Sequence, residues 1–185
     1  SVKIDSAVNV KDDISIISGA DSTGISFNMT SSGSLTTYEQ SANISINAVN
    51  DVIISGPITT QGSTSNLNIT SGEDTEILGN ISLTGTGSSL SIDSVESVKK
   101  IGAAKGKDYI TIISGADITG ISFNMTSSSS LTTYEQSANI NINSVNDAII
   151  SGPITTQGST SNLNITSGDD TEKWGDISLT GTGSS

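Results

Sequence analysis

Three residue types on which many enzymes depend are missing from this 185-residue chain, which contains no histidine, no cysteine and no arginine. Their absence excludes imidazole acid–base catalysis, thiol chemistry, zinc sites built from nitrogen and sulfur ligands, and bidentate guanidinium clamps on phosphate or carboxylate. We therefore predict that the chain is not an enzyme and has neither catalytic residues nor a cofactor-binding motif.

Positive charge is also scarce, because seven lysines stand against 19 acidic residues and leave a formal net charge of −12 at pH 7. Nucleic acids and anionic membrane surfaces repel a chain of this charge. The sequence also has no run of 18 apolar residues, which a membrane-spanning helix would need. Nucleic acid binding and membrane insertion are therefore excluded.

The residues that are abundant favour β-structure. Serine, threonine and asparagine number 36, 23 and 15, and isoleucine alone supplies 27 of the apolar residues. Branching at Cβ restricts the side chain least on a pleated strand, so an apolar set rich in isoleucine favours strands over helices. The composition predicts an all-β fold.

A long internal repeat organises the chain. The stretch from Ile17 to Ser89 recurs from Ile113 to Ser185, at an offset of 96 residues and with nine differences in 73 positions. Such self-similarity is typical of solenoids and other repeat architectures.

The start of the chain predicts where the repeat units divide. Ser1–Ser6 resembles Ser89–Ser94 at an offset of 88 residues. This match predicts two units of one continuous solenoid, residues 1–88 and residues 89–185, the second with a 96-residue period. Ser185 then takes the first position of a further unit. We expect the chain to be a fragment of a longer array, or to continue head-to-tail into another copy.

Within each unit a shorter step of 23 residues appears, since Asn43–Ile46 recurs as Asn66–Ile69. About four turns of 20 to 30 residues fill 96 residues. Short strands alternate apolar and polar residues within each turn and are separated by Gly, Ser, Asn or Asp. Stacking of equivalent strands about 4.8 Å apart predicts a parallel β-solenoid about 35 to 40 Å long. Examples of these strands are Ile44/Ile46, Val52/Ile54 and Ile58/Thr60. We expect Ile, Leu and Val to point into a narrow core and Ser, Thr and Asn to cover the outside. Only Asp93–Lys105 could hold a short helix or a basic surface loop.

The phrases NISINAVNDVIISGPITTQGSTSNLNITSG and GNISLTGTGSSLSID resemble the repeat region of filamentous haemagglutinin-like bacterial adhesins. The likeness covers nearly the whole chain and lies in composition and rhythm. It implies a right-handed parallel β-helix that serves as the stalk or fibre of an extracellular or cell-surface protein. It also implies a host or surface glycan or protein as a partner, contacted through parts of the protein outside this sequence.

Two acidic segments each carry three acids within four residues, and carboxylate oxygens are the ligands that Ca²⁺ prefers. The spacing is not that of an EF-hand loop, so a solvated turn is the alternative interpretation. The candidate calcium ligands are Glu73, Asp74, Glu76, Asp169, Asp170 and Glu172.

Paired carboxylates on adjacent turns could hydrolyse a glycosidic bond, because that reaction needs two carboxyl groups on either side of the scissile bond. Only six aromatic residues are present to stack on sugar rings. The candidate acids are Asp12, Asp13, Asp21, Asp51, Asp108, Asp117 and Asp147.

Two further surface features have alternative interpretations. Threonines such as Thr59–Thr60, Thr84, Thr86 and Thr155–Thr156 could form the regular ranks of an ice-binding solenoid, although they alternate irregularly with Ser, Asn and Gly. The Asn-x-Ser/Thr acceptor motif of N-glycosylation occurs six times, about as often as this composition gives by chance. These candidates are Asn28, Asn43, Asn68, Asn80, Asn124 and Asn164.

The sequence thus predicts a structural, extracellular β-solenoid of a bacterial surface adhesin or filament, which continues axially onto further copies of itself. A polysaccharide-binding or polysaccharide-cleaving β-helix and an ice-binding solenoid are the alternatives.

Overall fold

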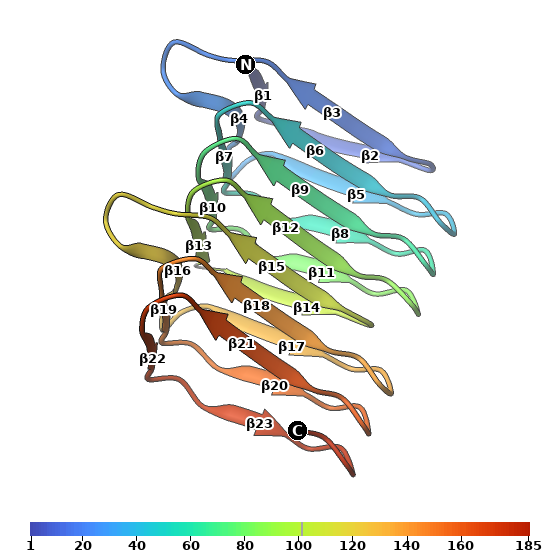
Figure 1. The fold of residues 1–185 in the computed structure, drawn as a ribbon. Helices are drawn as coiled ribbons and strands as arrows, with labels where there is room; N and C mark the ends of the chain where they lie inside the picture. Colours follow the sequence, from blue (N-terminus) through green and yellow to red (C-terminus); the bar gives the residue numbers. More distant parts are fainter. Residues whose placement is uncertain (101) are drawn as a thin grey trace.

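The computed structural model describes residues 1–100 and 102–185, and every regular element in these residues is a β-strand. The 23 strands form three parallel sheets, which we name A, B and C (Figure 1). Within the described residues, no helix of a kind that could cross a membrane occurs. The predicted all-β parallel β-helix is confirmed.

Each sheet collects every third strand of the chain. Sheet A consists of β1 (Val2–Ile4), β4 (Ile25–Met29), β7 (Asp51–Ile54), β10 (Thr75–Ile77), β13 (Val98–Lys100), β16 (Ile121–Met125), β19 (Asp147–Ile150) and β22 (Thr171–Lys173). Sheet B consists of β2 (Ala7–Val10), β5 (Ser34–Thr37), β8 (Ile58–Thr60), β11 (Ile81–Leu83), β14 (Ala103–Gly106), β17 (Ser130–Thr133), β20 (Ile154–Thr156) and β23 (Ile177–Leu179). Sheet C consists of β3 (Ile14–Ser18), β6 (Ile44–Ala48), β9 (Leu67–Ser71), β12 (Leu90–Ser94), β15 (Ile110–Ser114), β18 (Ile140–Ser144) and β21 (Leu163–Ser167).

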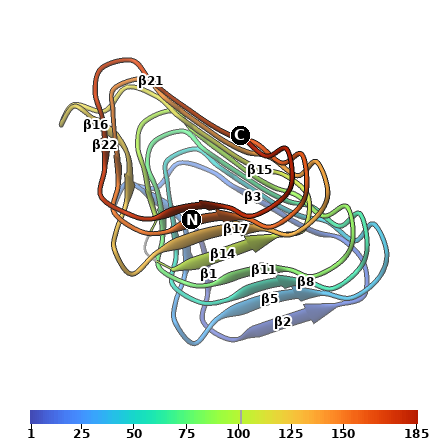
Figure 2. The ribbon, with the colours of Figure 1, turned by 90° about the horizontal axis from the view of Figure 1, so that it is seen from below.

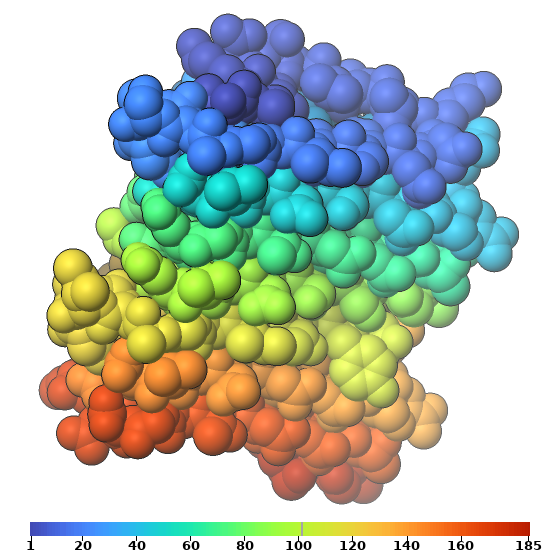
Figure 3. Space-filling model, turned by 45° about the horizontal axis from the view of Figure 1, so that its top comes forward, coloured from blue at the N-terminus to red at the C-terminus, as the bar shows by residue number. Residues whose placement is uncertain are grey.

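One strand from each sheet makes up one coil of the solenoid. We number the coils in chain order, so that coil 1 is β1–β3, coil 4 is β10–β12, coil 5 is β13–β15 and coil 8 is β22 with β23. Seen from below, the coils lie over one another around a common interior (Figure 2). In the space-filling view they form successive bands across the molecule (Figure 3).

The strand register sets the repeat period. In sheet A the ladder of paired residues passes through Val2, Phe27, Val52, Thr75 and Val98, one residue from each of five successive coils. Four coils therefore span 96 residues, which confirms the expected four turns per repeat. At about 4.8 Å per coil, four coils rise about 19 Å.

The register differs from the sequence alignment at the start of the chain. Ser1–Ser6 was matched above to Ser89–Ser94, but β1 lies in sheet A and β12 lies in sheet C. The residue four coils after Val2 is Val98, so Ser97 is the structural equivalent of Ser1. The 96-residue period thus extends back to the first coil, and residue 88 lies inside coil 4. The misalignment arose because strands of different sheets share the same alternation.

Alternation of side chains along each strand builds the core. The predicted inward residues Ile44, Ile46, Val52, Ile54 and Ile58 are all buried. Thr60 is buried as well, so the expectation that threonine covers only the outside is wrong at this position. Each of these residues stacks on its equivalent in the next coil, so apolar columns run the length of the solenoid. One such column in sheet C comprises Ile14, Ile44, Leu67, Leu90, Ile110, Ile140 and Leu163.

The expected helix or surface loop over Asp93–Lys105 is wrong. This segment contains the end of β12, all of β13 and the start of β14, while Ile101 lies outside the described residues. Val98 and Ala104 are fully buried and stack in the same columns as the other inward residues. Lysines and alanines favour a helix locally, but backbone pairing with the neighbouring coils outweighs that preference.

Glycine is required where the chain turns between sheets and the coils approach most closely. A Cβ atom placed on Gly85 would lie 1.9 Å from the carbonyl oxygen of Gly62 in the coil before. The same holds for Gly79, whose Cβ would lie 2.0 Å from the carbonyl oxygen of Gly56. Real atoms cannot approach so closely, so any side chain here must push two coils apart.

One buried residue is out of place in an apolar core. Lys100 follows Ile77 and precedes Met125 in an inward column of sheet A, and its side chain is fully buried. Its ammonium group donates a hydrogen bond to the carbonyl oxygen of Gly102. Burial lowers the pKa of Lys100 to about 7, because desolvation disfavours the charged form.

We expect Gly85→Ala to destabilise the solenoid by more than about 2 kcal/mol, because its Cβ has no room against the neighbouring backbone. Gly19→Ala is the matched control, since a Cβ at Gly19 would meet nothing within 4 Å. Urea denaturation of both variants measures the difference. Equal stabilities would contradict the close packing of the coils at Gly85.

We expect Lys100→Met to raise the free energy of unfolding at pH 6 by several kcal/mol and to flatten its dependence on pH. Below pH 7 the folded and unfolded chains both carry the ammonium group, so the cost of burying it is present in full. Between pH 7 and about 10.5 the unfolded chain keeps a proton that the folded chain has released, so stability rises with pH. Denaturation at pH 6, 8 and 10 checks this, with Lys105→Met at an exposed position as the control.

Candidate functional site

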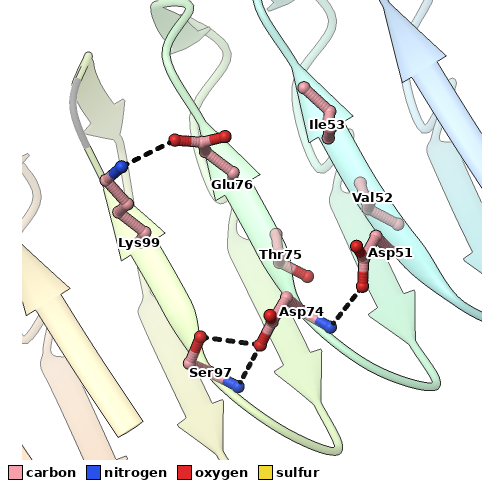
Figure 4. Close-up of a pocket in the computed structure, with 8 residues that line it drawn as sticks. All are labelled: Asp51, Val52, Ile53, Asp74, Thr75, Glu76, Ser97 and Lys99. Atoms are coloured by element: carbon pink, nitrogen blue, oxygen red, sulfur yellow. Dashed lines mark hydrogen bonds and ion pairs between the residues drawn. The ribbon is translucent and has the colours of Figure 1, made fainter. Parts of the chain in front are cut away.

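The candidate site is a polar pocket of about 200 Å³ on the outer face of sheet A, where β7, β10 and β13 lie side by side (Figure 4). It lies near the start of these strands, immediately after the chain turns from sheet C into sheet A. Its lining residues are Asp51, Val52, Ile53, Asp74, Thr75, Glu76, Ser97 and Lys99.

The carboxylates of this pocket connect one coil to the next. Asp51 Oδ1 accepts a hydrogen bond of 3.1 Å from the backbone N–H of Asp74. Asp74 Oδ1 in turn accepts from the backbone N–H and the hydroxyl of Ser97, at 2.8 and 2.7 Å. Glu76 forms an ion pair of 2.9 Å with Lys99. Each acid therefore has a structural contact with the following coil.

Negative charges crowd together at this corner. Burial raises the pKa of Asp51 above its ordinary value, and the neighbouring charges of Asp74 and Glu73 raise it further. Burial likewise raises the pKa of Glu96, with the charge of Asp74 as the next cause. These acids lose their charge more readily than exposed carboxyl groups as pH falls.

Asparagine and aspartate side chains act in the same way at the turn from sheet B into sheet C. Asn43 Oδ1 accepts from the backbone N–H of Asn66 at 2.9 Å, and Asn66 Oδ1 accepts from that of Ser89 at 3.0 Å. Asp13 makes the equivalent bond of 2.7 Å to Asn43. We call these inter-coil side-chain bonds Asx clamps. Sequence reasoning missed them, although acceptors recurring 23 residues apart before a strand are a readable signal.

The calcium candidates of the first acidic segment make separate contacts. Glu73 accepts from Asn50 Nδ2 at 3.0 Å, while Asp74 and Glu76 contact Ser97 and Lys99 as described above. In the second segment, Asp169 accepts from Asn146 Nδ2 at 3.3 Å, and Asp170 and Glu172 are exposed. Among the described residues, no group of three or more acids is arranged to hold a metal ion. Calcium binding stays a prediction.

The candidate acids for glycoside hydrolysis lie at different corners. Asp51 faces Asp74 in the next coil, and Asp147 accepts a hydrogen bond of 2.9 Å from the backbone N–H of Asp170. Asp12, Asp13 and Asp108 lie at the turn from sheet B into sheet C. Asp51 and Asp147 thus each stack on an aspartate of the next coil, and their carboxylate oxygens accept backbone hydrogen bonds.

Two further candidate acids, Asp21 and Asp117, lie in protruding loops that connect β3 to β4 and β15 to β16 (Figure 1). Asp21 Oδ1 accepts from the hydroxyl and the backbone N–H of Thr23, at 2.7 and 2.8 Å. These hydrogen bonds lower the pKa of Asp21, and the bond from the Thr119 backbone lowers that of Asp117. Both acids organise their own loops.

The glycosylation candidates Asn28, Asn43, Asn68, Asn80, Asn124 and Asn164 all point away from the core, as alternation predicts. Asn80 Oδ1 accepts from the backbone N–H of Ala103 at 2.9 Å, so it forms an Asx clamp like Asn43. Asn164 donates to Asn141 Oδ1 at 2.9 Å on the outer face of sheet C. N-glycosylation of these six asparagines stays a prediction.

Some of the threonines considered for an ice-binding face lie on the inner side of sheet B, and ice binding stays a prediction. Thr60 and Thr156 point inward and are fully buried. The outward column of sheet B offers one residue per coil, passing from Thr59 through Ser82 to Lys105. A lysine thus interrupts the column of hydroxyl groups.

No protein-family model, curated protein or solved structure showed a significant match to this chain.

We expect Asp74→Ala to lower the free energy of unfolding by about 1–2 kcal/mol, because the Ser97 N–H loses its acceptor. Asp74→Asn keeps an acceptor oxygen and should cost less. Asp93→Ala, at an exposed position of sheet C, is the control for removal of a carboxylate. Chemical denaturation measures all three, and equal effects at Asp74 and Asp93 would contradict a clamp.

Proposed function

We propose that this chain is a structural, extracellular β-solenoid that forms the stalk or fibre of a bacterial surface adhesin or filament. The observation that carries the proposal is the continuity of the three sheets, whose parallel ladders run through all eight coils in sheets A and B and through the first seven coils in sheet C. Each added coil extends the molecule by about 4.8 Å with the same contacts. The length of the solenoid is then the property that serves its function.

The surface supports this role. Outward positions are mostly Ser, Thr and Asn, with a net charge of −12, which keeps a long fibre hydrated and discourages lateral aggregation. The resemblance to haemagglutinin-like repeats supports the same placement outside the cell. We further propose that the solenoid continues axially onto copies of itself, and that a host or surface glycan or protein binds through other parts of the protein.

The pocket at Asp51 and Asp74 favours a second candidate function, the binding or cleavage of a polysaccharide. Two carboxylates on adjacent coils beside Ser97 and Lys99 offer hydrogen bonds to sugar hydroxyls. Their engagement in inter-coil bonds makes the structural role the better supported of the two.

Insertion of further 96-residue periods tests the stalk function. Each inserted copy of residues 17–112 should lengthen the particle by about 19 Å, measured by electron microscopy. A binding tag fused to the end should then reach a ligand held proportionally further from an anchoring surface. A particle that thickens or collapses instead would contradict the proposal, and release of reducing sugars from a polysaccharide panel would favour the second candidate.

A further inference from the structure

The contact between coil 4 and coil 5 contains three side-chain links between successive 96-residue periods. Asp74 accepts from Ser97, Glu76 pairs with Lys99 at 2.9 Å, and Asn80 accepts from the backbone N–H of Ala103. The backbones of β10 and β13, and of β11 and β14, pair in parallel beneath these links.

The same groups recur at the two ends of the molecule. Coil 8 repeats coil 4 after 96 residues, so Asp170, Glu172 and Asp176 stand where Asp74, Glu76 and Asn80 stand. Coil 1 repeats coil 5 at 96 residues in the other direction, so Ser1, Lys3 and Ala7 stand where Ser97, Lys99 and Ala103 stand. Coil 8 therefore offers the three acceptors and coil 1 the three donors.

We propose that coil 1 of a second copy of this chain docks on coil 8, in the register in which coil 5 follows coil 4. The inference rests on the proposed stalk function and specifies how the solenoid continues. We call this contact between coil 8 and the second copy's coil 1 the joint. It pairs β22 with β1 and β23 with β2 of the second copy, and it places Lys3 of that copy against Glu172. The strand pairing and the side-chain contacts of the joint are the same whether the two coils belong to two molecules or to one longer polypeptide.

Sheet C shows what else the joint requires. Sheets A and B each contain eight strands, whereas sheet C contains seven, and β12 has no equivalent in coil 8. Because β12 lies between β9 and β15, its equivalent in the joint lies between β21 and the second copy's β3. Docking thus leaves a slot one strand wide. A strand with the sequence of residues 90–96, LSIDSVE, fills the slot and connects equivalents of Ser89 and Ser97.

The apolar interior also continues across the joint. Val8 in coil 1 and Ile177 in coil 8 are only partly buried at the ends of the core columns, and docking stacks one on the other. Several positions differ from the internal contact. Ser6 stands where Gly102 stands, and a Cβ on Gly102 would lie 2.2 Å from the carbonyl oxygen of Gly79, so the second copy's turn at Ser6 must shift away from coil 8. Lys173 would stack on Ile4 where Ile77 stacks on Lys100. Burying the Lys173 ammonium weakens the joint, so Lys173→Ile should tighten it.

Charge exchange across the joint tests its register. In sedimentation experiments on the purified 185-residue protein at low salt, Glu172→Lys and Lys3→Glu should each weaken self-association about threefold to tenfold. The double variant should restore it, because the exchanged charges attract again. Exchange of the internal pair, Glu76→Lys with Lys99→Glu, is the control and should leave self-association unchanged.

Completion of the slot provides a second measurement. Extension of the chain after Ser185 by LSIDSVE should tighten self-association at least tenfold, whereas the same residues in scrambled order should not. A protein that stays monomeric with and without LSIDSVE, or charge variants that associate like the parent, would overturn the joint. Neither result would alter the lengthening by inserted periods, so failure of the joint is distinguishable from failure of the stalk function.

Discussion

Hydrogen bonding between the backbones of successive coils is the interaction on which this structure depends. Every strand pairs in parallel with the strand one coil before or after it, and the three resulting ladders run along the solenoid (Figure 1). Buried backbone groups must be paired, and strands of three to five residues cannot achieve this in isolation. The separation of about 4.8 Å between coils follows from this bonding, and the side chains at each position must fit that separation.

At the corners between sheets, the short separation between coils restricts which side chains fit. Gly62 and Gly85 stand where no Cβ fits between the coils, and Asn43, Asn66 and Asp74 provide oxygens for N–H groups at the edges of the strands. Carboxylates and amides that resemble ligand-binding residues in the sequence therefore hold the coils in register. This repeated use of the same contacts is consistent with the proposed structural role.

The periodic parts of the sequence predicted the fold well, and isolated features predicted it poorly. Alternation at Ile44 and Ile46 identified inward residues because burial on one face imposes a period of two. The same alternation occurs in all three sheets, so it could not show that Ser1 corresponds to Ser97 and not to Ser89. Nor could the sequence place Lys100 in the core. The helical preference of the lysines and alanines in this segment gives no information on the pairing of β13 with its neighbours. The roles of the acids depended on contacts across 23 residues, which single segments do not reveal.

Disulfide trapping in this naturally cysteine-free chain tests the stacking of coils most directly. Thr59 and Ser82 point outward from paired positions of β8 and β11, one coil apart, within the reach of a disulfide bond. Thr36 lies one coil further away, at roughly twice the distance from Ser82. The variant with cysteines at 59 and 82 should oxidise quantitatively within one molecule, and the variant with cysteines at 36 and 82 should stay reduced. Efficient bonding of the second pair but not the first would contradict the 23-residue coil and the solenoid built on it.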